Sequence, residues 1–236
     1  MASDFTVNAE PVHFKEAIDF FRSKLRLGTR AWTDIWQDQH ARTFVVAGAM
    51  KDDLVKDFQE AVGEAIAEGK TLDQFRKEFD DIVARHGWSY NGGRGWRSRV
   101  IFQTNMRGVY ASGRWQQVER QKSRRPFARY VAVRDDNTRP EHQAWHNTIL
   151  PVDDPFWTTH GPPNGWGCRC RVQSLSARDV KRLGLKVSEK APEIRMRDAE
   201  VNTPEGRVRI TVPEGIDPGF AWNPGQPANE PARLGG

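Results

Sequence analysis

The sequence predicts an α+β fold, with helices in the first half of the chain and a small irregular β unit after them. Apolar residues recur at helical spacing up to about residue 119. Two short alternating stretches, 130–133 and 170–173, flank a segment rich in Pro and Gly, and Pro, Gly and charge dominate from Lys186 onward. We therefore expect three regions: an N-terminal helical arm at 1–50, a main domain at 51–185 and an extended C-terminal arm at 186–236.

The helical half divides at glycines and capping residues. Gly69 is expected to end one helix, and Thr71 with Gln74 has the form of a capping box that begins the next. The Gly-rich stretch 90–95 is interpreted as a hinge, because the phosphate-binding pattern GxxxxGK[ST] is absent. Apolar spacing predicts helices at 12–25, 33–45, 51–68, 71–86 and 96–119.

The last third of the chain contains few regular elements. Ser176 and Asp179 form a second capping box, which predicts a short helix at 176–183. One strand is expected at 208–212. The aromatic stretch 219–225 is expected to dock on another surface rather than fill a core of its own chain.

The central segment, defined as residues 130–172, concentrates the residues that carry chemistry. It holds both cysteines of the chain, three of its six histidines and three of its nine tryptophans, together with five prolines. Such a composition predicts a compact irregular unit held by side chains. The residues expected to build it are Asp136, Arg139, Trp145, Asp153, Trp157, Pro163 and Trp166. Of these, Arg139 is expected to pair with Asp135 or Asp136, and Asp153 to cap a turn.

Two explanations for the stability of the central segment stay open. Tryptophan packing is one, since a large apolar area is buried while the indole N–H finds a carbonyl. A Zn²⁺ ion held by thiolate and imidazole is the other, with His142, His160, Cys168 and Cys170 as ligands and His146 as the substitute for His142. Without a metal, the cysteines would be buried free thiols, because Cys-x-Cys on a strand separates the side chains by roughly 6.5 Å, near the limit for a disulfide.

A basic block lies between Gly92 and Arg134, where eleven Lys and Arg residues face a single acid, Glu119, in a chain of net charge +5. Clustered arginine binds phosphates or carboxylates, so the block is expected to meet DNA or an acidic partner protein. The candidate residues are Arg94, Arg97, Arg107, Arg114, Arg120, Lys122, Arg124 and Arg125.

Catalysis is not expected from the central segment. Cys168, His160 and Asp154 could form a nucleophilic set, and Asp136, His142 and His146 a metal-dependent nuclease set. Neither matches a mechanistic motif at diagnostic spacing. A metal-dependent nuclease is therefore kept as the alternative to a non-enzymatic role.

Three ordered motifs resemble the phage Mu F-like family of minor head, or head-morphogenesis, proteins. They are TNMRGVYASGRWQQ at 104–117, RDDNTRPEHQAWHNTILPVDDPFW at 134–157 and PPNGWGCRC at 162–170. The resemblance implies a minor head protein of a tailed phage or prophage, located in the virion. It further implies that the portal, major capsid or scaffolding protein, and packaged DNA, are its partners. Members often have Gly at the position of His146.

The composition indicates a modest core and a large polar surface that is available to partner proteins. The hydrophobic fraction is 37% and the mean hydropathy is −0.73. No apolar run approaches the ~18 residues of a membrane helix, and the N-terminus lacks a signal-peptide pattern. We therefore expect synthesis in the host cytoplasm and no membrane partner.

Overall fold

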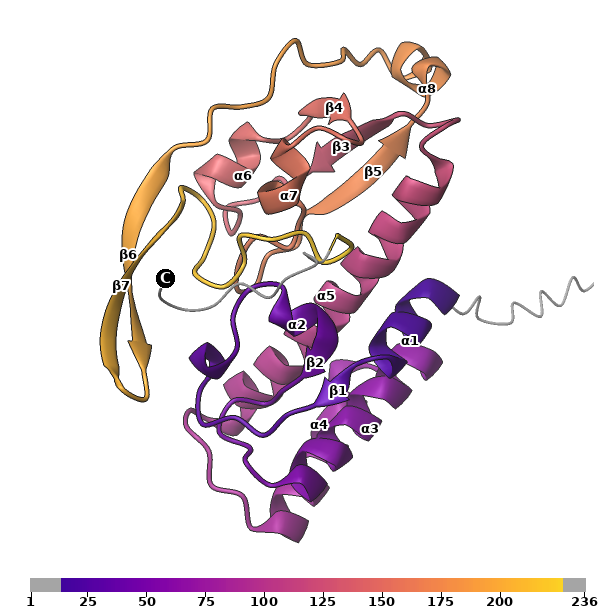
Figure 1. The fold of residues 1–236 in the computed structure, drawn as a ribbon. Coiled ribbons are helices and arrows are strands. Elements are labelled where there is room, and N and C mark those ends of the chain that lie inside the picture. The colour runs from indigo at the N-terminus through magenta and orange to yellow at the C-terminus, as the bar shows by residue number, and fades with distance from the viewer. Residues whose placement is uncertain (1–13, 227–236) are drawn as a thin grey trace, which may run out of the picture.

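A lower helical body and an upper β-containing body are joined by one long helix in the computed structural model, which describes residues 14–226 (Figure 1). This is the α+β organisation that the sequence predicts. Four helices build the lower body: α1 (Lys15–Arg22), α3 (Asp52–Glu68), α4 (Leu72–His86) and the first half of α5 (Arg94–Gln121). The second half of α5 continues into the upper body (Figure 1).

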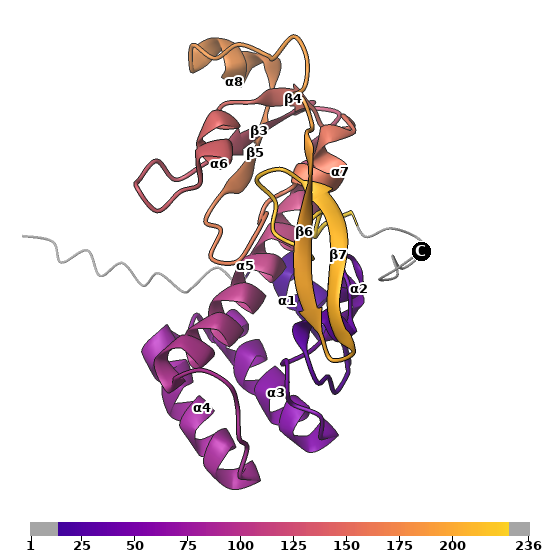
Figure 2. The same cartoon turned by 90° about the vertical axis from the view of Figure 1, so that its left-hand side faces the viewer.

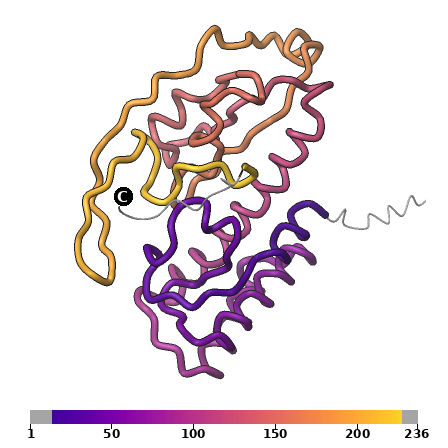
Figure 3. Tube along the Cα trace, in the orientation of Figure 1, coloured from indigo at the N-terminus to yellow at the C-terminus, as the bar shows by residue number. Residues whose placement is uncertain are grey.

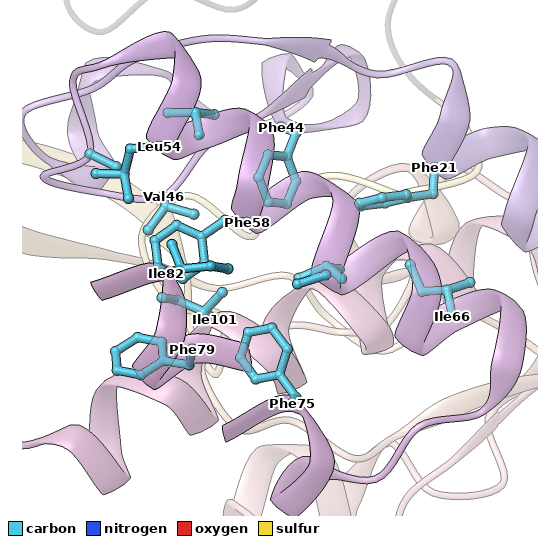
Figure 4. Packing of buried hydrophobic residues seen from close by; sticks show 14 of the residues in the cluster. Phe21, Phe44, Val46, Leu54, Phe58, Ile66, Phe75, Phe79, Ile82 and Ile101 are labelled. Carbon is cyan, nitrogen blue, oxygen red and sulfur yellow. The ribbon is translucent and has the colours of Figure 1, made fainter. Parts of the chain in front are cut away.

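The core of the lower body is built from the apolar faces of these helices. Phe58 of α3 and Phe75 and Phe79 of α4 are fully buried and point toward one another (Figure 4). Phe21 of α1 meets Phe44 edge to face, with ring centroids 5.6 Å apart. Helical spacing of the aromatic residues therefore explains why α1, α3 and α4 pack as one layer around α5.

The boundaries of α3 and α4 confirm the sequence prediction. Gly69 ends α3 with a left-handed backbone, φ +70°. The Gln74 N–H donates to Thr71 Oγ1 at 3.3 Å, and the Thr71 N–H donates to Gln74 Oε1 at 2.7 Å. This reciprocal capping satisfies two N–H groups that the helix itself leaves without partners.

The prediction of a helix at 33–45 is wrong. This stretch forms a 3-10 turn, η1 (Trp32–Asp34), a single helical turn, α2 (Gln39–Arg42), and a strand, β2 (Thr43–Phe44), that pairs in parallel with β1 (Leu25–Arg26). Gln37 has φ +43°, a left-handed conformation that interrupts a right-handed helix.

The upper body contains a three-stranded antiparallel sheet in the order β4-β3-β5. Its strands are β3 (Phe127–Val131), β4 (Ile149–Pro151) and β5 (Arg171–Leu175), with Tyr130 opposite Val172. Two short helices of the central segment, α6 (Pro140–Ala144) and α7 (Phe156–His160), lie beside the sheet, and α8 (Ala177–Arg182) follows it. Trp115 of α5 and Trp157 of α7 are buried in the shared core, with ring centroids 5.8 Å apart.

The C-terminal region differs from the expected arm. It forms a two-stranded hairpin, β6 (Met196–Thr203) and β7 (Gly206–Pro213), instead of one strand. The hairpin runs along one side of the molecule toward η1 (Figure 2). The chain then returns to the upper body, as the yellow part of the trace shows (Figure 3).

The aromatic stretch 219–225 packs on its own chain, so the prediction that it docks elsewhere is wrong. Ile216 is fully buried in the upper core, and the Phe220 ring lies 5.0 Å from that of Trp166. The Asn223 side-chain amide donates to the Trp157 carbonyl at 3.1 Å. Residues 1–13 and 227–236, which complete the expected arms, lie outside the described residues. Among the helices at 14–226, none is long and apolar enough to cross a membrane.

Candidate metal centre

His142 lies on α6, a helix that Pro140 begins at its first position. Its ring is 2% exposed and stacks on Trp145, with centroids 5.1 Å apart. The His142 Nε2 atom is 2.9 Å from the Gly215 carbonyl oxygen. Because a carbonyl only accepts, Nε2 carries the proton, and the lone pair of the neutral ring lies on Nδ1.

Both cysteines face that lone pair. Cys168 Sγ is 3.7 Å and Cys170 Sγ is 3.6 Å from His142 Nδ1. The alternation of an extended chain puts residues 168 and 170 on one side, just before β5. Among the described residues these are the three His, Cys or acidic side chains whose ligand atoms gather within 4.8 Å. Both cysteines are free thiols rather than a disulfide.

Both sulfur–nitrogen distances fit a tetrahedral metal. Metal–sulfur bonds of about 2.3 Å and metal–nitrogen bonds of about 2.1 Å place sulfur and nitrogen about 3.6 Å apart across a tetrahedral edge. The two S···N distances match this value. The hydrogen bond to Gly215 fixes the imidazole tautomer, as outer-shell carbonyls do in metal sites. The group can therefore hold a metal ion.

The two thiols have different proton affinities. The Cys170 thiol donates a hydrogen bond to Cys168, and this, with a smaller contribution from the Asn164 N–H, lowers the pKa of Cys168 to about 4 against the opposing effect of burial. The same coupling to the Cys168 thiolate, followed by burial, raises the pKa of Cys170 above its ordinary value. Cys168 is therefore the more acidic of the two thiols, and the thiolate is the form in which cysteine binds metals.

The structure does not bring His160 to this group. Its ring stacks on Phe156, with centroids 4.3 Å apart, and its Nδ1 lies 2.8 Å from Thr159 Oγ1. Burial lowers the pKa of His160 to about 4, which agrees with a neutral packed ring. His146 is also outside the group, because its Nδ1 accepts the Ala132 N–H at 3.2 Å. The proposed zinc set of four is therefore reduced to three.

The salt bridges of the central segment differ from the expected pairing of Arg139 with Asp135 or Asp136. Arg139 pairs with Asp217 at 2.7 Å, and the same carboxylate accepts the Trp166 N–H at 2.7 Å. Asp135 instead pairs with Arg169, through two N···O contacts of 2.5 and 2.7 Å. The sequence predicts that Arg139 pairs inside the turn, and this is wrong. Its partner, Asp217, lies in the segment after β7 that returns to the upper body, here called the returning chain.

Two acidic residues expected in the centre lie at its edge. Asp136 is exposed, and no side-chain bond of it is found within 14–226. Asp153 is exposed and pairs with Lys122 at 2.7 Å. Asp154 is the turn acceptor, since its Oδ1 accepts the Phe156 N–H at 2.9 Å. Neither the Cys168, His160 and Asp154 set nor the nuclease set is therefore assembled in the structure.

The expected tryptophan packing holds for two of three residues. Trp157 is fully buried and donates its indole N–H to the Pro151 carbonyl at 3.0 Å, and Trp145 is 7% exposed. Trp166 is 41% exposed, with its ring 6.0 Å from that of Trp32. Pro163 lies beside Trp166 in the wall of an apolar cavity between the two bodies.

Internal contacts occupy much of the basic block. Arg94 pairs with Asp80, Arg120 with Glu16, Lys122 with Asp153 and Arg125 with Asp179. Arg97 donates to the Ala47 carbonyl and lies over the Trp88 ring. Within 14–226, no ion pair or side-chain hydrogen bond is found for Arg107, Arg114 and Arg124.

Sequence reasoning did not identify the residues that hydrogen-bond to the central segment from outside it, nor the buried Asn164 within it. Gly215 and Asp217 come from the returning chain, about 75 residues after His142 and Arg139. Asn164 is fully buried and accepts the Tyr130 hydroxyl at 2.9 Å. The motif GIDPG at 215–219 indicates a turn, but nothing in it identifies His142 or Arg139 as partners.

The comparisons with known proteins agree with these motifs. The family described as Phage Mu protein F like protein matches residues 56–173, which include all three ligand-type residues of the candidate centre. The chain belongs to this family. It is thus a Mu F-like protein, and the resemblance noted from its sequence motifs is confirmed.

Two curated relatives of this Mu F-like chain extend the match beyond the family region. The "Putative capsid assembly protein F" of Escherichia phage Mu is 36% identical over 243 residues, covering 91% of this chain and 54% of that protein. The "Mu-like prophage FluMu F protein" of Haemophilus influenzae is 37% identical over 194 residues, covering 77% and 47%. The chain therefore spans about half the length of these relatives. No solved structure gives a significant match.

Proposed function

We propose that this Mu F-like chain acts in the assembly of a tailed-phage head and becomes part of the virion. The observation that carries the proposal is family membership together with 36% identity to a protein named for capsid assembly. The fold supports a role in binding, because the central segment forms a buried unit with Trp145 and Trp157 in its core. The partners are head proteins, namely the portal, major capsid or scaffolding protein.

Fractionation of lysates tests this role. Heads and procapsids banded on a density gradient should contain the tagged protein at a fixed ratio to the major capsid protein. A soluble host protein carried through the same gradient measures contamination. If the tagged chain stays in the free fractions while heads form normally, the assembly role is wrong.

We further propose that Zn²⁺ is the ion held by His142, Cys168 and Cys170. Two thiolates and one imidazole form a soft set that favours zinc over magnesium or calcium. Bound zinc would tie α6 to the start of β5, and its hydrogen-bonded histidine would extend that tie to the returning chain at Gly215. Its role in this proposal is structural.

Cobalt substitution tests the ligand set, since Co²⁺ occupies tetrahedral zinc sites and absorbs visible light there. Addition of Co²⁺ to the metal-free protein should give sulfur-to-cobalt charge-transfer absorption, and addition of Zn²⁺ should remove it. Cys168→Ser should lose the band, and Thr159→Ser, next to the excluded His160, should keep it. Absence of the band in the wild-type protein would refute the site.

A further inference from the structure

A recess beside the candidate metal centre combines several arginines with both cysteines. It has a volume of about 260 Å³ and lies between α5 and the start of β5. We call it the arginine recess; the residues used here are Arg107, Arg114, Arg169, Arg171, Ala111 and Cys168. No acidic side chain of the described residues lines it. Its walls therefore present positive charge without an internal carboxylate.

Three of the four arginines have no ion-pair or side-chain hydrogen-bond partner among residues 14–226. Arg169 is engaged by Asp135 at 2.5 and 2.7 Å. For Arg107, Arg114 and Arg171, the described part of the chain supplies neither an ion pair nor a side-chain hydrogen bond. Elsewhere in the basic block, most cations are paired internally. Arg99 and Arg124 also lack a side-chain partner within 14–226 but do not line the recess, which brings three such arginines together.

Burial makes one of these arginines unusual. Arg107 is half-buried, and burial lowers the pKa of its guanidinium. Removing a cation from water without a hydrogen-bonded partner is unfavourable. An external anion would supply the missing interaction.

The arrangement of the arginines favours a short segment that carries carboxylates. Arg107 and Arg114 are seven residues apart on α5, which places them on one face about 10.5 Å apart along the axis. Arg171 approaches from β5, so the three converge on one recess. Duplex DNA needs cations spread along several phosphates, whereas one or two carboxylates fit a space this small.

We propose that the arginine recess binds an acidic peptide segment of another head protein, with carboxylates bonded to Arg107, Arg114 and Arg171. The identity of the partner as a head protein rests on the proposed assembly function. Guanidinium groups suit this ligand, because their planar donors bind carboxylates in a bidentate manner.

Binding of a dye-labelled hexaglutamate peptide, followed by fluorescence anisotropy, tests the proposal on the whole chain with its metal. Arg107→Gln/Arg114→Gln/Arg171→Gln should weaken binding by at least about tenfold, since the loss of even one charge-assisted hydrogen bond costs about a factor of ten. The control Arg99→Gln/Arg124→Gln/Arg178→Gln removes equal charge from exposed arginines with no side-chain partner at 14–226. It should change the affinity by less than about threefold.

A second variant places a carboxylate inside the recess. Ala111 lies four residues after Arg107 and three before Arg114, so the glutamate in Ala111→Glu can pair with both. We expect this variant to abolish peptide binding while the protein stays folded. Equal losses in the recess and control triples, or no wild-type binding at millimolar peptide, would overturn the proposal. Tighter recess-dependent binding of a labelled DNA duplex would overturn it in favour of a phosphate partner.

The outcome separates this proposal from the assembly function. If hexaglutamate fails to bind but the protein still bands with heads, the recess proposal falls alone. If the peptide binds as expected but the protein stays out of heads, the assembly function falls alone.

Discussion

At the scale of single residues, the candidate centre depends on one backbone carbonyl. The Gly215 oxygen accepts from His142 Nε2 and so turns Nδ1 toward the cysteines. Gly215 has φ +80°, and a Cβ there would lie 2.7 Å from Glu141 Cβ and 2.8 Å from the Trp145 ring. Only glycine satisfies both the backbone angle and the close approach.

Gly215→Ala should therefore lower the free energy of unfolding by about 2 kcal/mol or more, from strain at positive φ plus steric overlap. Urea denaturation followed by circular dichroism measures this change. Gly184→Ala is the matched control, because Gly184 has φ +61° with open space around it. It should cost only about 1 kcal/mol. Equal costs at the two positions would show that the contact with α6 is unimportant.

The three ligand-type residues could be found from the sequence, but the choice between His142 and His160 could not. Both histidines lie in the central segment at plausible spacing from the cysteines. Gly215 and the ring of Phe156 decide their orientations, and the Gly215 contact joins residues 73 positions apart. The same long range explains why Asp217 was missed as the partner of Arg139.

At the scale of elements, α8 shows how a local cap connects to the distant link between α5 and β3. Asp179 accepts the Ser176 hydroxyl at 2.7 Å and the Ser176 N–H at 3.1 Å. It also pairs with Arg182 and with Arg125, each at 2.9 Å. The hydrogen bonds from Ser176, followed by the arginines, hold the pKa of Asp179 well below its usual range.

This shift predicts a pH dependence of stability. The unfolded carboxyl binds a proton near its ordinary pKa of about 3.9, whereas the folded carboxylate stays ionised below that value. The stabilising contribution is therefore complete above about pH 4 and is lost as pH falls toward the lower folded pKa.

Asp179→Asn should lower the thermal midpoint at pH 7, and the difference from wild type should shrink between about pH 4 and pH 2. Differential scanning calorimetry at several pH values measures both. Asp136→Asn, at an exposed position with no side-chain partner in the described chain, should show neither effect. A pH-independent difference for Asp179→Asn would contradict the pKa assignment.

Sequence reasoning located elements whose ends are set by local bonds. The caps at Thr71 and Ser176 each use a partner three residues away, so both helices were predicted. The structure of the stretch 33–45 was not predicted correctly, because its strand β2 forms only by pairing with β1. Its apolar residues pack separately, since Phe44 meets Phe21 in the lower core and Trp36 stacks on Trp32.

At the scale of the whole molecule, the C-terminal region closes the upper body. Ile216 is fully buried in the core formed by α5, the sheet and α7. Gly225 approaches so closely that a Cβ would lie 2.3 Å from Trp115 Cβ. The sequence indicated an arm because Pro and Gly dominate there, but composition does not distinguish a free segment from one packed in extended form.

Ile216→Ala should accordingly lower the free energy of unfolding by about 2–4 kcal/mol, the range for truncating a buried aliphatic side chain. Chemical denaturation of the full chain gives the value. Leu183→Ala removes a side chain at a residue that is 44% exposed and should cost less than about 1 kcal/mol. Similar small costs at both positions would mean that the returning chain is not part of the core.

The metal content of the purified protein tests the central claim, that His142, Cys168 and Cys170 form a metal centre, most directly. Mass spectrometry of wild type, His142→Phe and His160→Phe compares two buried histidines that receive the same replacement. We predict about one Zn²⁺ per chain in wild type and His160→Phe, and almost none in His142→Phe. A wild-type protein without zinc, or equal zinc loss in both variants, would contradict the account.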